Sequence, residues 1–133
     1  MKTLKKLLDE RAARAPLFVA PDDTVFFALE LMAKHDIGAL MVMRDDHLAG
    51  IFSERDYARK IILLGKSSKE TAVREIMTEK VLYARPEQNT DEAMALMTEK
   101  HIRHLPVLDS EKRVIGMVSM ATWSRKPSAS RLS

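Results

Sequence analysis

The chain of 133 residues contains no cysteine. Disulfide bonds, thiolate nucleophiles and cysteine-ligated metals are therefore excluded, and nothing in the sequence marks an oxidising compartment. Long apolar runs are also missing, since even the stretch from Ile37 to Met43 is far shorter than the roughly twenty residues that span a bilayer. The basic start of the chain is interrupted by Asp9 and Glu10, so it predicts an amphipathic helix and not a signal peptide. We expect a soluble cytoplasmic protein.

The sequence also lacks the motifs of the common enzyme classes. It has no Gly-x-Ser-x-Gly nucleophile elbow, no His-Glu-x-x-His pair and no P-loop. His101 and His104 have helical spacing, but no further ligand at the usual spacing completes a metal site. We expect solvated or phosphate-facing histidines there and no metal. A binding protein without catalysis is favoured over an undescribed hydrolase.

Excess positive charge is confined to the end of the chain. The formal net charge is +3, from 22 basic and 19 acidic residues, and Arg125, Lys126 and Arg131 account for it. The chain up to Ser119 is therefore neutral and lacks the basic stripe that is typical of nucleic-acid binding. Nucleic acid is consequently not expected as a partner.

What the sequence does contain is an internal repeat. Three segments of the first half recur in the second half at offsets of 65, 65 and 66 residues: Ala28–Met32 as Ala93–Met97, Ile37–Val42 as Ile102–Val107, and Gly50–Ser53 as Gly116–Ser119. The one-residue slip falls in a polar turn, where insertions are tolerated most easily. The duplication predicts two related structural units.

Each unit has the pattern of a short strand, a helix, a β-hairpin and a second helix. Short strands are predicted over 17–20 and 81–84, helices after the N-cap residues Thr24 and Asn89, and hairpins over 39–52 and 105–118. The second helix of the first unit is predicted from Glu54 to Leu64, with Gly65 at its C-cap. A separate helical turn is predicted over 72–77. Methionines on these elements most simply fill the core, although a Met-rich partner groove is an alternative.

These elements predict an α+β fold with the order β-α-β-β-α in each repeat. A repeat of this size buries too little apolar surface alone, so we expect the two to pack sheet to sheet about a pseudo-twofold axis, with ligand clefts between them. The predicted segments are an N-terminal helix (1–16), a first repeat (17–65), a linker with a lead-in helix (66–80), a second repeat (81–119) and an atypical basic tail (120–133).

The duplicated order, with Gly50, Ser53 and Asp56 forming Gly-x-x-Ser-x-x-Asp after the first hairpin, resembles the CBS-domain pair, or Bateman module. The resemblance runs from Leu17 to Ser119. Within the family, the chain is similar to stand-alone bacterial two-CBS-domain signalling proteins. It implies a regulatory homodimer that binds an adenosine-containing ligand (AMP, ADP, ATP or NAD) without catalysis. A ligand-independent dimerisation scaffold is the alternative.

The resemblance also implies the binding residues. Asp56 is expected to accept both ribose hydroxyls, and Ser53 to hold phosphate together with neighbouring backbone N–H groups. Arg103 and His104 are the expected phosphate partners. On local sequence alone a helix capping box is the better interpretation of Ser53 and Asp56, and only the duplicated context favours nucleotide binding. The remaining candidates are Ala20, Ile37, Gly38, Ala39, Arg55, Ala84 and Ser119.

The end of the second repeat departs from the family pattern. Met120–Pro127 stands where a Gly-Asp pair and an amphipathic helix are expected, and Thr122 takes the place of the acidic residue. The codons that can encode this stretch allow Ile-Gly-Asp when they are read one base over, so a single-base deletion, natural or from cloning, is our hypothesis for this tail. We therefore expect a missing or altered final helix and one intact ligand site instead of two.

Overall fold

The structure is a computed structural model that describes residues 2–10 and 17–120. It divides into two compact units, one from Leu17 to Val81 and one that contains the N-terminal helix and the chain from Leu82 onward. The tail expected over 120–133, with its altered final helix, lies outside the described residues except for Met120. Within the described residues, no helix is both long and apolar enough to cross a membrane.

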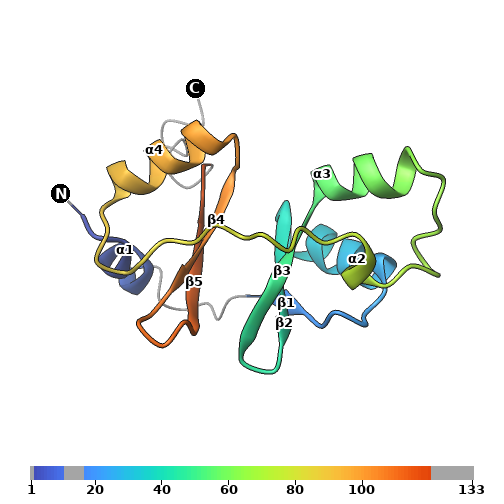
Figure 1. The fold of residues 1–133 in the computed structure, drawn as a ribbon, viewed down its shortest axis with the longest axis horizontal. Coiled ribbons are helices and arrows are strands. Elements are labelled where there is room, and N and C mark those ends of the chain that lie inside the picture. Colours follow the sequence, from blue (N-terminus) through green and yellow to red (C-terminus); the bar gives the residue numbers. More distant parts are fainter. Residues whose placement is uncertain (1, 11–16, 121–133) are drawn as a thin grey trace. The chain divides into compact units, whose positions relative to one another are not determined.

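The first unit consists of a three-stranded sheet and the helices that follow its strands (Figure 1). β1 (Phe18–Val19) pairs in parallel with β2 (Ala39–Arg44), which pairs antiparallel with β3 (His47–Ser53). The 11-residue helix α2 (Val25–His35) connects β1 to β2. The predicted hairpin is confirmed, because apolar and β-branched residues flank a polar turn.

Helix α2 has signals at both of its ends. The hydroxyl of Thr24 accepts a hydrogen bond from the N–H of Phe27 at 3.1 Å, so the predicted N-cap is confirmed. The helix ends at Asp36, whose φ of 53° lies in the left-handed region and whose N–H donates to the carbonyl of Ala33. These caps determine where α2 begins and where the chain turns into β2.

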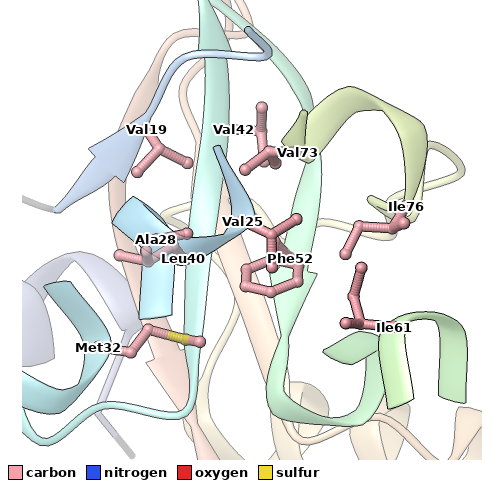
Figure 2. Close-up of a cluster of buried hydrophobic side chains, with 10 residues drawn as sticks. All are labelled: Val19, Val25, Ala28, Met32, Leu40, Val42, Phe52, Ile61, Val73 and Ile76. Atoms are coloured by element: carbon pink, nitrogen blue, oxygen red, sulfur yellow. The ribbon is translucent and has the colours of Figure 1, made fainter. Parts of the chain in front are cut away.

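One cluster of buried apolar side chains forms the core of this unit (Figure 2). α2 contributes side chains that lie one turn apart, and β2 contributes alternate residues. The other members of the cluster come from β1, from β3 and from the chain that follows β3. The buried members are Val19, Val25, Ala28, Met32, Leu40, Val42, Phe52, Ile61, Val73 and Ile76.

The helix after β3 differs from the prediction. α3 (Glu54–Asp56) runs directly into η1 (Tyr57–Ile62), which is a π-helix, so the single regular helix expected up to Leu64 is wrong in type and in its last residues. A π-turn widens the backbone to i→i+5 hydrogen bonding and changes the direction in which later side chains point. Gly65 has a φ of 69°, the left-handed conformation expected at a helix end.

In its described residues, 2–10 and 82–120, the second unit contains a two-stranded sheet and the helices α1 (Leu4–Glu10) and α4. β4 (His104–Leu108) and β5 (Val114–Ser119) form the predicted hairpin, and α4 (Thr90–Lys100) precedes it. The expected strand over 81–84 is reduced to an isolated parallel bridge between Ala84 and Val107. Asn89 is the predicted N-cap of α4, accepting from Glu92 N–H at 2.8 Å. The buried cluster consists of Leu4, Leu7, Ala84, Ala93, Met97, Leu105, Val107 and Val118.

The segment before each repeat belongs to the core of the other repeat. η2 (Val73–Glu75) lies in the first unit, where Val73 is 0% exposed and Thr71 accepts from the N–H of Val25 at 2.9 Å. α1 (Leu4–Glu10) lies in the second unit, and Thr90 N–H donates to the carbonyl of Lys2 at 3.1 Å. The residues expected to be a linker therefore complete the core of the first unit.

Candidate functional site

Asp56 lies where β3 ends and α3 begins. Ser53 is the N-cap of α3, and its hydroxyl accepts from the N–H of Asp56 at 3.2 Å. In return, Asp56 Oδ2 accepts from the N–H of Ser53 at 3.0 Å and from its hydroxyl at 3.1 Å. The capping-box interpretation of these two residues is therefore confirmed. Asp56 is 7% exposed, and a buried carboxylate is stable only when donors of this kind surround it.

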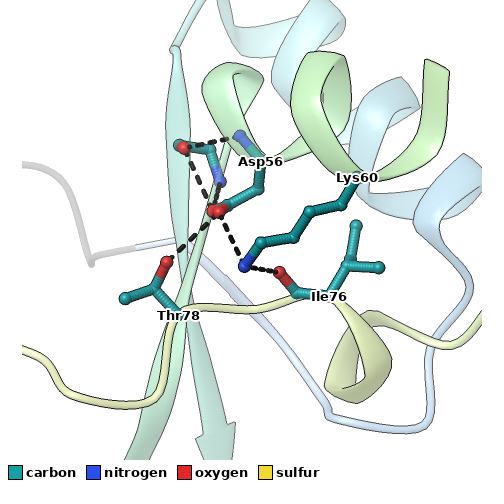
Figure 3. A network of polar contacts seen from close by, with 5 residues as sticks. Asp56, Lys60, Ile76 and Thr78 are labelled. Carbon is teal, nitrogen blue, oxygen red and sulfur yellow. Dashed lines mark hydrogen bonds and ion pairs between the residues drawn. The ribbon is translucent and has the colours of Figure 1, made fainter. Parts of the chain in front are cut away.

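A second set of donors reaches Asp56 from elsewhere in the unit (Figure 3). The hydroxyl of Thr78 donates to Oδ1 at 3.1 Å, and the Nζ atom of Lys60 forms an ion pair with the same oxygen at 3.4 Å. Lys60 also donates to the carbonyl of Ile76 at 3.0 Å. The carboxylate thus joins the helical segment that starts at α3 to the segment that follows η2.

Small residues of the predicted site lie beside this carboxylate. Ala39 is the β-sheet partner of Ser53, and the N–H of Glu54 donates to the carbonyl of Gly38 at 3.0 Å. Ile37, half-buried, precedes them in the chain. Strand pairing brings Ala39, and the hydrogen bond brings Gly38, to the start of α3. Arg55 is on the exposed side of the same helical turn.

Ala20 directly follows β1, which pairs with the later part of β2. It follows Val19, which pairs with Val42, and Val42 in turn pairs with Gly50. Ser53 pairs with Ala39 instead, three residues away along β2. Ala20 N–H donates to Asp23 at 2.9 Å, in the turn before α2. Strand pairing does not bring Ala20 to Asp56, and the sequence could not show this because it does not specify the register of β1.

Four predicted site residues belong to the second unit. His104 pairs with Ser119 across the hairpin, and the N–H of Met120 donates to the carbonyl of Arg103 at 2.9 Å. Burial and the neighbouring charge of Arg103 lower the pKa of His104 from its usual 6.5. Ala84 is 1% exposed, and its backbone forms the isolated parallel bridge to Val107.

Sequence reasoning missed two residues of the polar network. Lys60 lies four residues after Asp56, and this i, i+4 spacing of opposite charges was an available signal. Thr78 lies 22 residues after Asp56, and no local pattern connects the two. The network consists of one carboxylate, the two hydroxyls and one backbone N–H that donate to it, and one ammonium group paired with it. Among the residues that the structure describes, no group of His, Asp or Glu could hold a metal ion.

The comparison with protein families decides the identity of the fold. A model of the CBS domain matches residues 9–63 and again residues 73–123. The chain belongs to the CBS-domain family. The predicted duplication and the resemblance based on Gly50, Ser53 and Asp56 are both confirmed, because each CBS match contains one of the two hairpins.

CBS-domain proteins of known sequence or structure resemble this chain over most of its length. The mitochondrial CBS domain-containing protein CBSX3 of Arabidopsis thaliana is 49% identical over 109 residues, which cover 78% of this chain and 52% of that protein. A solved CBS-domain protein of Burkholderia ambifaria MC40-6 is 48% identical with a TM-score of 0.87, covering 92% of this chain and 91% of that one. The chain thus spans about half the length of the Arabidopsis protein.

A third similar protein has been solved with ligands. The CBS domain pair of protein MJ0100, in complex with 5′-methylthioadenosine and S-adenosyl-L-methionine, is 25% identical to this chain with a TM-score of 0.80. The similarity covers 94% of each chain. Both compounds contain adenosine, so a CBS pair of this fold binds that chemical group in at least one protein.

Proposed function

We propose that this CBS pair is a regulatory sensor that binds an adenine nucleotide (AMP, ADP, ATP or NAD) and does not turn it over. The observation that carries the proposal is the Asp56 carboxylate, which is 7% exposed and lies at the start of a helix in the Gly-x-x-Ser-x-x-Asp motif. The adenosine-containing ligands of the MJ0100 pair support the class of ligand.

The proposed contacts follow from the chemistry of each group. A carboxylate accepts from both hydroxyls of a ribose, which is a strong interaction because the acceptor is charged. Ser53 and its neighbours supply hydroxyl and N–H donors for phosphate, and Gly38 and Ala39 present little side-chain bulk beside them. Arg103 and His104, with Ala84 and Ser119, are the proposed contribution of the second unit. Ala20 is retained as a candidate contact away from the carboxylate.

The proposed output is a change of packing. A ligand that binds one arrangement of the two repeats or of two protomers more tightly shifts the population toward it, and that shift is the signal. Catalysis is not needed for such a role. We propose a cytoplasmic homodimer as the functional form.

Thermal unfolding with added nucleotide tests the proposal. A ligand that binds only the folded protein stabilises it by about 2.7 kcal/mol at one hundred times its Kd, so AMP, ADP, ATP or NAD must raise Tm. GMP serves as the control for general phosphate effects. Product analysis of the ATP sample should detect no hydrolysis. Absence of any adenine-specific shift contradicts the proposal.

Replacing Asp56 with Asn tests the residue. Loss of the charged acceptor should weaken nucleotide binding by about 1.5 to 3 kcal/mol. Because Asp56 also caps α3, the variant is compared with Glu92→Gln, which alters the equivalent capping box of α4, where Glu92 accepts from Asn89 N–H at 3.0 Å. If Asp56→Asn binds nucleotide as tightly as the wild type, Asp56 caps α3 but does not bind the ligand.

A second function, a ligand-independent dimerisation scaffold, is favoured by one observation. Ile62, Leu63 and Leu64, at the end of η1, are 58%, 75% and 64% exposed. Three consecutive exposed apolar side chains are unusual on a monomer surface and are typical of a contact surface. A protein that dimerises through them and binds no nucleotide would fit this alternative.

A further inference from the structure

The acceptor sites of Asp56 are already filled from within the chain. A carboxylate offers about four acceptor positions. The N–H and hydroxyl of Ser53 use Oδ2. The hydroxyl of Thr78 and the ammonium of Lys60 use Oδ1 (Figure 3). Two ligand hydroxyls therefore cannot bind this carboxylate unless some of these donors leave.

Lys60 is the donor that leaves at the lowest cost. The Ser53 donors belong to the capping box of α3, so their loss would also uncap the helix. Lys60 is 40% exposed in its side chain and its Nζ lies 3.4 Å from Oδ1, the longest of the four contacts. A partly exposed ion pair of this kind changes an equilibrium constant by no more than about fivefold, and water can solvate the released ammonium.

We propose that Lys60 is an intramolecular competitor of the ligand at Asp56. In the ligand-free protein its ammonium and the hydroxyl of Thr78 occupy Oδ1, and the two hydroxyls of a bound vicinal diol take these two places. This inference rests on the proposed function, because it assumes that a diol binds Asp56. Lys60 therefore sets the affinity of the site without being one of the groups that bind the ligand.

The competition also connects the site to the chain that joins the two repeats. The ammonium that pairs with Asp56 donates to the carbonyl of Ile76 at 3.0 Å, and Thr78 donates to Oδ1 two residues later. Displacement of both groups from Oδ1 removes the attachment of Thr78 to the helix and leaves the Lys60 ammonium held by the carbonyl of Ile76 alone. The backbone bonds between Ile51 and Thr78, at 2.8 and 3.0 Å, remain and keep the segment on β3. Ligand binding thus loosens the side-chain attachments of this segment and preserves its strand-like pairing.

The first test is titration of wild type, Lys60→Met and Lys66→Met with adenosine. Adenosine is uncharged, so attraction between lysine and phosphate does not enter the result. Lys66→Met is the matched control, because Lys66 is exposed and the change in charge is the same. Loss of a competing ion pair predicts roughly two- to fivefold tighter binding in Lys60→Met and no change in Lys66→Met.

Each outcome of the titration has one meaning. Equal or weaker binding in Lys60→Met, with adenosine bound by the wild type, overturns the inference and leaves the proposed function intact. No binding of adenosine, AMP, ADP, ATP or NAD by any of the three proteins overturns the proposed function, and the inference with it. Binding by Lys60→Met alone supports both. If Lys60→Met shows no cooperative thermal transition, Lys60→Gln, which also removes the ammonium, replaces it.

The second test measures the release of the amine directly. Limited acetylation, read by mass spectrometry, compares Lys60 and Lys66 with and without saturating adenosine. Release from Asp56 predicts faster modification of Lys60 in the presence of adenosine, with Lys66 unaffected. Slower modification of Lys60 would mean that the ligand covers it, and an unchanged rate would mean that it is not displaced. Either result overturns the inference.

Discussion

A Cβ atom on Gly50 would lie 2.7 Å from the carbonyl oxygen of Thr78. The segment cannot easily retreat, because Ile51 and Thr78 exchange two backbone hydrogen bonds next to this position. We predict that Gly50→Ala destabilises the protein by about 1 to 3 kcal/mol, the usual cost of overpacking. The free energy of unfolding in urea measures the effect.

Gly116→Ala is the matched comparison in the second repeat. Its Cβ would lie 2.8 Å from Cδ2 of Leu8, which is the end of a flexible side chain and not backbone. The side chain can move aside, and loss of a glycine also lowers the entropy of the unfolded chain. We predict a loss below about 1 kcal/mol. Equal losses at the two glycines would contradict the view that the backbone contact of Gly50 determines its cost.

The N-caps of α2 and α4 give a second prediction. Thr24 and Asn89 occupy equivalent positions in the two repeats, and each accepts a backbone N–H. Thr24→Ala and Asn89→Ala should each cost about 0.5 to 2 kcal/mol of stability, whereas Thr24→Ser should cost little because it keeps the hydroxyl. Chemical unfolding of the three variants measures this. A cost for Thr24→Ser as large as that for Thr24→Ala would show that packing of the methyl group dominates.

Much of the fold could be predicted because its signals are local. Both hairpins, the caps at Thr24 and Asn89 and the left-handed Gly65 follow from patterns within a few residues, and the repeat follows from direct comparison of the two halves of the sequence. The capping box of Ser53 and Asp56 also has a sequence signature, Ser followed three residues later by a carboxylate. These features were correctly assigned because nothing distant competes with them.

The rest depends on contacts between residues far apart in the chain. Thr78 reaches Asp56 across 22 residues, and Val73 and Ile76 enter the core of the repeat before their own. The π-helix over Tyr57–Ile62 was missed because side-chain spacing in a short helix does not distinguish i→i+4 from i→i+5 bonding. The pairing of β1, which places Ala20 away from Asp56, likewise has no local signal.

His104 gives a third prediction, concerning pH. Burial and Arg103 lower the pKa of His104 in the folded protein, so the unfolded chain binds the proton more readily. Stability therefore rises with pH in the window just below 6.5 and is lost as the pH falls through it. We expect Tm to fall as the pH is lowered from about 7.5 to about 5.5, a range in which most carboxylates stay ionised.

The control for this prediction is a second histidine. His104→Gln should flatten the dependence of Tm on pH in that window, whereas His47→Gln, at the exposed start of β3, should leave it as in the wild type. Identical slopes in wild type and His104→Gln would assign the pH dependence to other groups.

The exposed end of η1 gives the last prediction. If Leu63 and its neighbours form the proposed dimer contact, Leu63→Ser should convert the dimer to monomer, because a buried leucine contributes about 1.5 to 3 kcal/mol and each dimer buries two copies. Sedimentation velocity measures the oligomeric state. Phe18→Ser is the control, since Phe18 is apolar, 58% exposed and in β1. A dimer that survives Leu63→Ser, or a wild type that stays monomeric at high concentration, excludes this surface as the contact and removes the main support for the scaffold function.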